Sequence, residues 1–183
     1  TWLPESYVGG SKEDLKYIVE KMEQLGPEFE QIAQSIKTNP DAFIIFAFDT
    51  NIGSSRFSTN MNVTEEFVPT NMSMDLILDN VVHTYESYGW NVTFLSKWMA
   101  LGISFLLLYH WHPHLSGDYE TAHIIVEVNT QGVKSKLIQF IVKCGNSLWA
   151  ITFGTGPSEF DERLPDFEAS ISSLEIGDST CNK

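Results

Sequence analysis

Apolar residues recur at helical spacing in three stretches of the first half of the chain. Between Ser11 and Leu25 the apolar side chains fall on one helical face, and Ser11 with Asp14 three residues later predicts a capping-box start. A Gly-Pro pair ends this helix, because proline cannot continue the hydrogen-bond ladder. The same spacing predicts a short second helix over residues 29–36 and a further helix over Ser73–Tyr88.

The remaining apolar segments are typical of β-strands. Residues 42–48 are continuously apolar, which favours a strand covered on both faces, and residues 60–68 alternate. Beyond Gly89 the pattern changes to period two with short turns, and it predicts strands at 90–99, 103–112, 121–129, 133–143 and 148–154. Connections this short join antiparallel neighbours, so we expect one meandering antiparallel sheet with a tight turn at Gly145-Asn146.

The last helix is complicated by Pro165. Proline is tolerated only near the start of a helix, so we predict that the regular helix begins at Pro165 and that residues 160–164 form a preceding turn. Phe167, Ile171 and Leu174 would then form its buried stripe. This stripe should close the core over the preceding strand pair.

Helices before, between and after an antiparallel sheet predict an α+β fold with the helices laid against the sheet. The short connection after the last strand leaves the final helix no other surface within reach, so we expect Phe167 to meet Trp149 beneath it. With 43% hydrophobic residues and no linker, the 183-residue chain is predicted to form one domain over 1–183, with an N-terminal helical segment at about 11–37.

The charge balance restricts the class of partner. A net charge of −13 repels phosphate backbones and anionic lipid headgroups, so we expect no nucleic-acid partner and no membrane-surface role. No apolar run approaches the roughly 20 residues that a spanning helix needs. The chain begins with Thr1, which is compatible with a removed signal peptide or lipid-anchored N-terminus.

Within this acidic chain, no acid lies between Glu127 and Glu159, whereas the predicted hairpin carries Lys134, Lys136 and Lys143. This basic island could receive an anionic ligand or an acidic patch of a partner. Alternatively, the lysines protect an edge strand from aggregation.

Several motifs resemble the PsbP-like superfamily, which includes the extrinsic photosystem II subunit, Ran-binding relatives and small bacterial secreted or lipid-anchored proteins. The resemblance spans roughly Phe43 to Ile176. It rests on the segments Met72-Ser73-Met74-Asp75, Leu101-Gly102-Ile103, Leu148-Trp149-Ala150-Ile151-Thr152-Phe153, Glu159-Phe160-Asp161, Leu164-Pro165 with Phe167, and Ser172-Ser173-Leu174.

The resemblance implies an α/β/α sandwich around a meandering antiparallel sheet, and a binding or assembly role rather than catalysis. The chain has no motif for Ran binding or for docking on a photosystem, and its acidic helical segment before Phe43 departs from the photosystem subunit. It is more similar to the uncharacterised bacterial branch. This implies an extracytoplasmic or cell-envelope location and an unidentified protein or small ligand as partner.

The sharpest candidate chemistry is a histidine cluster. Three imidazoles at alternate positions would point to one face of an extended strand, with successive side chains about 7 Å apart; they are His110, His112 and His114. Such a cluster could bind Zn²⁺ or Cu²⁺, with a further ligand from the facing strand, namely His123, Asp118 or Glu120. Alternatively, Pro113 ends the strand and the histidines lie on a surface loop.

Catalytic signatures are weaker. The chain has no G-x-S-x-G elbow, and its carboxylate pairs, Glu65-Glu66 and Asp161-Glu162, are adjacent in sequence and therefore do not face one another across a substrate. We therefore expect a non-catalytic binding or assembly module without a cofactor. The alternative is a metal-binding protein or a hydrolase that uses the histidine cluster.

The two cysteines form no metal motif. Cys144 lies at the predicted hairpin turn and Cys181 near the end of the chain. They are either joined in a disulfide or are two unrelated thiols.

Overall fold

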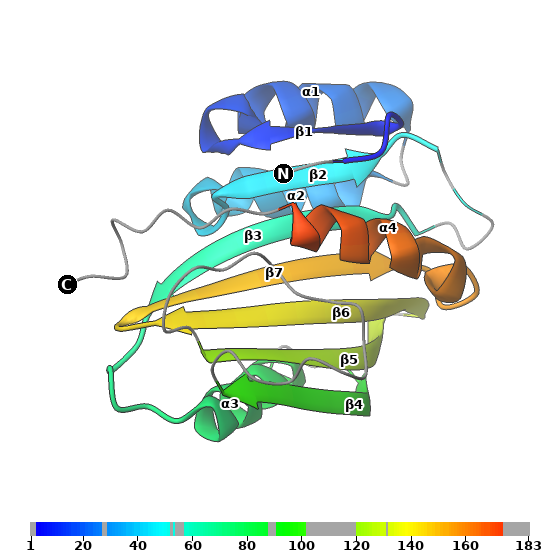
Figure 1. Ribbon diagram of the computed structural model, residues 1–183. Helices are drawn as coiled ribbons and strands as arrows, with labels where there is room; N and C mark the ends of the chain where they lie inside the picture. Colours follow the sequence, from blue (N-terminus) through cyan, green and yellow to red (C-terminus); the bar gives the residue numbers. More distant parts are fainter. Residues whose placement is uncertain are drawn as a thin grey trace.

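A computed structural model describes residues 3–26, 29–51, 53, 57–87, 91–101, 120–130 and 132–173. Within these residues seven antiparallel strands form one sheet in the order β1-β2-β3-β7-β6-β5-β4 (Figure 1). The strands are β1 (Tyr7–Ser11), β2 (Ile45–Asp49), β3 (Asn60–Phe67), β4 (Asn91–Leu101), β5 (Glu120–Thr130), β6 (Val133–Cys144) and β7 (Ser147–Thr155). The helices are α1 (Leu15–Leu25), α2 (Glu30–Thr38), α3 (Met74–Ser87) and α4 (Phe160–Ser172), with 3-10 turns η1 (Lys12–Asp14) and η3 (Pro40–Ala42).

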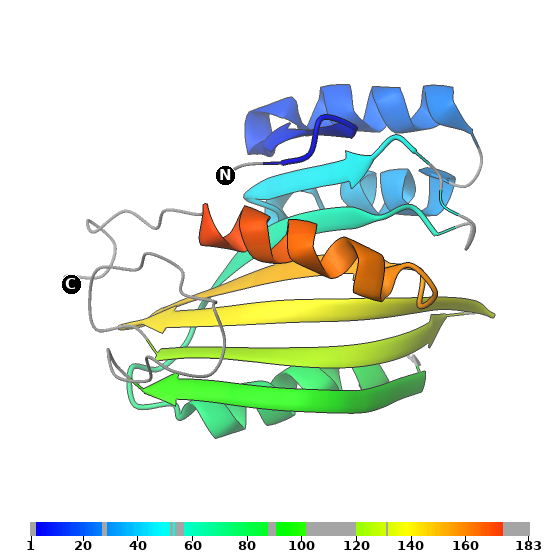
Figure 2. The same cartoon turned by 45° about the vertical axis from the view of Figure 1, so that its right-hand side comes forward.

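Helices cover both faces of the sheet. Helix α4 lies on the front face in Figure 1, whereas α2 and α3 lie behind the sheet, and the rotated view in Figure 2 shows the same arrangement. Helix α1 belongs to the back face too, because it shares a buried cluster with α2 and with Phe46 and Phe48 of β2. The predicted α+β fold and α/β/α sandwich are therefore confirmed.

The meander is confirmed from β4 to β7, with one correction. Strand β4 pairs directly with β5, from Asn91 opposite Asn129 to Leu101 opposite Glu120, whereas we expected its neighbour to be the strand predicted at 103–112. Residues 102–119 lie outside the described part of the chain. The β6–β7 hairpin closes as predicted at Gly145-Asn146, where Gly145 has a φ of 60°, a backbone conformation that glycine adopts without strain.

Strand β1 was not predicted, because its sequence has two glycines and a weak alternation. The structure explains one of them. A Cβ atom added to Gly9 would lie 2.3 Å from Cβ of Ala47 on the paired strand β2, so only glycine allows this close approach.

The start of α4 is a second correction. The helix begins at Phe160 and contains Pro165 in its interior, whereas we predicted a start at Pro165. Phe160 is 1% exposed and packs edge-on against the ring of Phe167, and the amide of Arg163 donates to the carbonyl of Glu159 over 3.0 Å. Burial of Phe160 thus extends the helix ahead of the proline.

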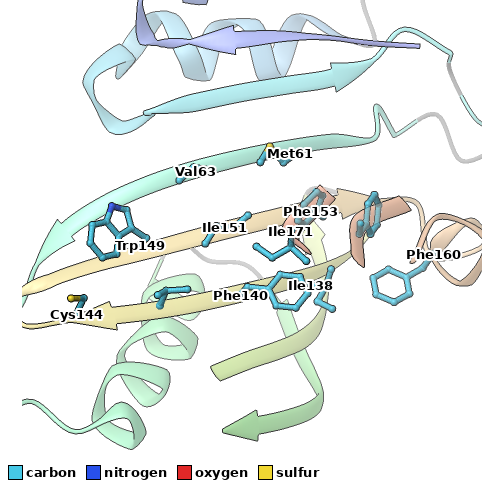
Figure 3. Close-up of a cluster of buried hydrophobic side chains, with 12 residues drawn as sticks. Met61, Val63, Ile138, Phe140, Cys144, Trp149, Ile151, Phe153, Phe160 and Ile171 are labelled. Atoms are coloured by element: carbon cyan, nitrogen blue, oxygen red, sulfur yellow. The ribbon is translucent and has the colours of Figure 1, made fainter. Parts of the chain in front are cut away.

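The front face carries one large cluster of apolar side chains (Figure 3). Phe167 and Ile171 of α4 are buried in it as predicted, while Leu174 lies outside the described residues. The ring that meets Phe167 is Phe153, stacked at a centroid distance of 4.9 Å, and not Trp149 as expected. Trp149 lies four residues earlier on the same face of β7, in a different part of the cluster (Figure 3).

The back face carries two separate clusters. The first joins α1 and α2 to β2 through Ile18, Met22 and Phe29. Ser11 and Asp14 form the predicted capping box ahead of α1. The second cluster joins α3 to β5, β6 and the start of β7. The parts of β3 and β7 between these clusters carry polar or small side chains on this face, which positions the site described below.

Candidate functional site

The predicted histidine cluster lies in residues 102–119, outside the described part of the chain. Of its proposed fourth ligands, Glu120 and His123 are described, and Asp118 is not. Glu120 projects from the back face, where Oε1 lies 2.7 Å from Lys143 Nζ. His123 lies opposite Phe140 on the front face, so the two side chains cannot complete one metal shell together.

His123 itself is half-buried, and its imidazole lies edge-on to the ring of Phe140 at a centroid distance of 5.7 Å. Desolvation by burial lowers the pKa of His123 below the ordinary value of 6.5. The neutral imidazole is therefore favoured in the fold. No group of three metal-binding side chains gathers among the residues that the structure describes.

The predicted basic island does not form. Lys143 is 5% exposed and paired with Glu120 on the back face. Lys136 projects from the front face, where Nζ lies 4.2 Å from the ring centroid of Phe160 and 3.8 Å from Asp161 Oδ1. Since these residues are seven positions apart on one strand, alternation sends them to opposite faces. Strand β6 is also interior to the sheet, so its lysines protect no edge.

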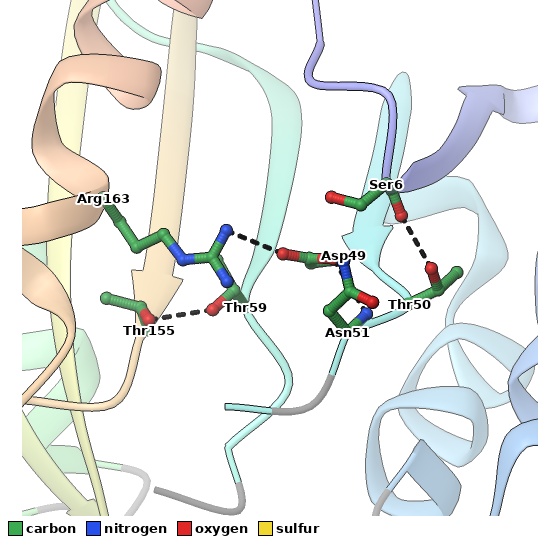
Figure 4. Close-up of polar contacts among 7 residues, drawn as sticks. All are labelled: Ser6, Asp49, Thr50, Asn51, Thr59, Thr155 and Arg163. Carbon is green, nitrogen blue, oxygen red and sulfur yellow. Dashed lines mark hydrogen bonds and ion pairs between the residues drawn. The ribbon is translucent and has the colours of Figure 1, made fainter. Parts of the chain in front are cut away.

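A buried row of polar groups lies beneath the first turn of α4, at the end of the sheet (Figure 4). Arg163 Nη1 lies 2.8 Å from Oδ2 of the fully buried Asp49. The other carboxylate oxygen of Asp49 accepts the amide of Asn51 over 2.9 Å. Next to this pair, the hydroxyls of Thr59 and Thr155 lie 2.8 Å apart.

This row fastens α4 to the N-terminal strands. Tyr7 lies opposite Asp49 in the β1–β2 register, and burial, reinforced by the Asp49 charge, raises the pKa of Tyr7 above its ordinary value. Asp49 Oδ2 makes an ion pair but no aligned hydrogen bond. Because Asp49 is 0% exposed, a substrate does not reach this carboxylate. The row is an anchor rather than a reaction centre.

A second polar feature crosses the back face between its two apolar clusters. We call it the polar strip and define it by six residues: Asn62 and Thr64 of β3, Ala150 and Thr152 of β7, Gln139 of β6, and Tyr85 of α3. Asn62, Thr152 and Gln139 are directly opposite one another in the register of three adjacent strands. Unlike the apolar clusters on either side, the strip reaches solvent, because Asn62, Thr64 and Ala150 are partly exposed.

Hydrogen bonds organise the inner part of the polar strip. Gln139 Nε2 donates to Thr152 Oγ1 over 2.9 Å. Burial raises the pKa of Tyr85 to about 12, and a hydrogen bond with Gln139 opposes that rise. Gln139 Oε1 remains buried without a hydrogen-bond partner, a situation that costs about 1–3 kcal/mol.

The polar strip contains neutral groups alone. Its side chains are two carboxamides, two aliphatic hydroxyls, one neutral phenol and one methyl group. On the same face, Lys143 is paired with Glu120, and the exposed Glu66 follows Thr64 on β3. The strip itself can form hydrogen bonds, but it offers neither a charged group nor a nucleophile beside a base.

Sequence reasoning did not single out the polar strip. The available signal was a polar residue inside an otherwise apolar strand, Gln139 in the run LIQFIV and Thr152 in the run WAITF. Neither residue is unusual alone. Their alignment with Asn62 depends on the pairing of β3 with β7, which connects segments about ninety residues apart.

No protein-family model matches the chain, and no curated protein matches it in sequence. Solved structures that share its fold include the following two. The solution structure of the cyanobacterial PsbP protein CyanoP from Synechocystis sp. PCC 6803 has a TM-score of 0.52 at 9% identity, over 92% of this chain and 81% of that one. PA94 from Pseudomonas aeruginosa, of unknown function, has a TM-score of 0.52 at 8% identity, over 66% of this chain and 74% of that one.

These likenesses establish the fold. The chain has a PsbP-like fold, which confirms the resemblance seen in its strand and helix motifs. Neither likeness carries a residue role to this chain, because the sequences are nearly unrelated. The function has to be argued from the surfaces described above.

Proposed function

We propose that this chain, with its PsbP-like fold, is a non-catalytic binding or assembly module that works outside the cytoplasm and recognises its partner through the polar strip. The observation that carries the proposal is the contrast between charged and neutral polar groups. The buried charges of Asp49 and Lys143 are paired within the protein. The polar groups of the strip that reach solvent, those of Asn62 and Thr64, are neutral, and the exposed carboxylate of Glu66 lies beyond Thr64 on the same face of β3.

Two observations support a location outside the cytoplasm. Cys144 is disulfide-bonded, and disulfides persist in oxidising compartments. The one other cysteine of the chain, Cys181, lies outside the described residues. The fold is also that of CyanoP, a cyanobacterial PsbP protein. Among the described residues, no helix is both long enough and apolar enough to cross a membrane.

The test uses two neighbouring residues of β3 that point to opposite faces. Thr64→Lys adds one positive charge to the polar strip, and Glu65→Gln removes one negative charge from the front face, so the net charge changes equally. Both variants would be expressed with an affinity tag in source cells and recovered with their partner. We expect Thr64→Lys to recover about tenfold less partner than wild type, because a desolvated unpaired charge opposes binding.

Glu65→Gln should recover as much partner as the wild type. Equal recovery by Thr64→Lys would contradict binding through the polar strip. If the wild-type protein turned over a substrate and the Thr64→Lys variant retained that activity, the non-catalytic assignment would be contradicted. Folding of both variants is checked first by their unfolding curves.

The second candidate function is metal binding or metal-assisted hydrolysis by His110, His112 and His114, which their alternating spacing favours. Isothermal titration of the purified protein with Zn²⁺ and with Cu²⁺ tests it. A variant with all three histidines changed to alanine is the control. The candidate survives if the wild type binds the metal and the variant does not, and it ends if no heat appears at high micromolar metal.

A further inference from the structure

We propose that the C-terminal segment, residues 174–183, docks on the front face of the sheet, where a disulfide between Cys144 and Cys181 holds it over Trp149. This inference concerns the face opposite the polar strip and does not depend on recognition through the strip. It is carried by the burial of Trp149, by the place where α4 ends and by the disulfide of Cys144.

Trp149 lies beyond the end of α4. Among the described helices, α4 is the one that lies on the front face, and it runs toward the β6–β7 hairpin (Figure 1). From Phe167, which stacks on Phe153, the helix continues to Ser172, or about 8 Å at the helical rise. From Phe153 to Trp149 the distance along β7 is about 13 Å at the strand rise. The helix therefore ends short of Trp149.

The side chains beyond the helix are nevertheless buried. Trp149 is 7% exposed, and Val142, directly opposite it on β6, and Cys144, nearer the turn, are each 4% exposed. Figure 3 shows Trp149 and Cys144 at the end of the cluster away from Phe160. The neighbouring strand adds no cover there, because Glu65, opposite Trp149 on β3, is itself exposed. A buried tryptophan in this place requires cover from another part of the chain.

The disulfide identifies the covering segment. Cys144 is disulfide-bonded, and the chain has one other cysteine, Cys181. Cys144 lies opposite Ser147, which is about 20 Å from Phe153 along β7, so about 12 Å separate it from the end of α4. The eight residues that lead from Ser173 to Cys181 reach at most about 27 Å. A bond to Cys144 therefore ties the segment across Trp149 with chain to spare.

The composition of the segment agrees with this place. Leu174 and Ile176 are apolar and come directly after α4, where Trp149 has to be covered, and the residues after them are small or polar. The cover does not extend across β3, because Phe67, opposite Ser147, is 79% exposed. The segment therefore covers the hairpin strands β6 and β7 and leaves the end of β3 open.

The first test is a peptide map of the disulfide. Trypsin cuts after Lys143 and Arg163, so Cys144 and Cys181 fall in the adjacent peptides 144–163 and 164–183. Free thiols are first blocked by alkylation, and the protein is digested with and without a reductant. We expect the two peptides to be joined without the reductant and separate with it. Separate peptides in both digests would overturn the proposal.

The second test measures the cover itself by hydroxyl-radical labelling of the full chain. Trp149 is the one tryptophan of peptide 144–163, so mass spectrometry can locate its oxidation. Cys181→Ser removes the bond, and we expect oxidation of Trp149 to rise several-fold. Phe153 lies under α4 in the same peptide and should keep its wild-type protection, which shows that the sheet and helix stay folded.

A second variant keeps the disulfide and changes the docked segment. Ile176→Asp puts a charge against the apolar end of the face and should also raise oxidation of Trp149. Asp178→Asn, two residues further along, is the matched control and should behave as the wild type does. If Cys181→Ser also exposes Phe153, that variant is unfolded and Ile176→Asp decides. Wild-type protection of Trp149 in Ile176→Asp and in a folded Cys181→Ser would overturn the proposal, because another part of the chain would then cover this end of the face.

Discussion

The two faces of the sheet bury their side chains in different ways. On the front face one helix, α4, covers a continuous cluster that runs from Met61 of β3 to Phe140 of β6. On the back face two groups of helices cover two separate clusters, and the strands between them carry neutral polar groups. Continuous apolar packing stabilises a fold without offering a partner anything to recognise, whereas the interrupted face leaves hydrogen-bonding groups in reach of solvent.

Because its apolar cluster is continuous, the front face should contribute most of the stability of the fold. Truncation of Phe167 tests this expectation. Phe167 is 1% exposed and stacks on Phe153, so Phe167→Ala should lower the free energy of unfolding by about 3–5 kcal/mol through lost burial and a residual cavity. Urea unfolding measures the change. Phe67→Ala is the matched control, because Phe67 is 79% exposed, and it should stay within about 0.5 kcal/mol of wild type.

The anchor beneath α4 gives the second largest effect. Arg163→Met keeps most of the aliphatic stem but leaves the buried carboxylate of Asp49 without its cation, and we expect a loss of about 2–3 kcal/mol. The double variant Asp49→Asn/Arg163→Met removes both charges. It should be more stable than Arg163→Met alone, and the reverse order would show that the ion pair does not fasten α4.

Much of this front face could be predicted from the sequence, because its periodicity is local. The stripe of Phe167 and Ile171 and the hairpin before it follow from spacing within a few residues. The start of α4 could not be predicted, since the local rule for Pro165 was overridden by burial of Phe160 against a ring seven residues away. The ring that contacts Phe167 is set by the point where α4 crosses β7, and no local sequence pattern specifies that point.

The back-face strip was beyond sequence reasoning for a different reason. Its residues come from β3, β6, β7 and α3, and only the long-range pairing of β3 with β7 brings Asn62 beside Thr152. Alternation along β6 separates residues that sequence reasoning had grouped. Lys136 and Lys143 are close in sequence, but their side chains project from opposite faces.

Removal of the carboxamide from the polar strip should change stability much less than truncation of Phe167. Gln139→Met loses hydrogen bonds to Thr152 and Tyr85, and it also removes a buried acceptor without a partner. These contributions oppose each other, so we expect the free energy of unfolding to stay within about 1 kcal/mol of wild type. A loss as large as that of Phe167→Ala would make the strip a structural element.

The smallest expected effect is on the pH dependence of the free energy of unfolding. Burial lowers the pKa of His123 in the folded chain below 6.5, so the unfolded chain binds the proton more readily. The stability that this residue contributes is present above pH 6.5 and is lost as the pH falls below that value. His123→Gln should therefore lose less stability than wild type between about pH 7 and about pH 5.

The most direct test asks which face of the sheet is covered when the protein is bound to its partner. Thr64→Cys places a thiol in the polar strip and Phe67→Cys places one on the front face of the same strand, while the disulfide-bonded Cys144 does not react. Maleimide labelling of each variant is compared between the free protein and the complex with the native partner recovered from source cells. Recognition through the back face predicts that the complex protects the thiol at position 64 and leaves the thiol at position 67 as reactive as in the free protein. Protection at position 67 with full reactivity at position 64 would contradict it.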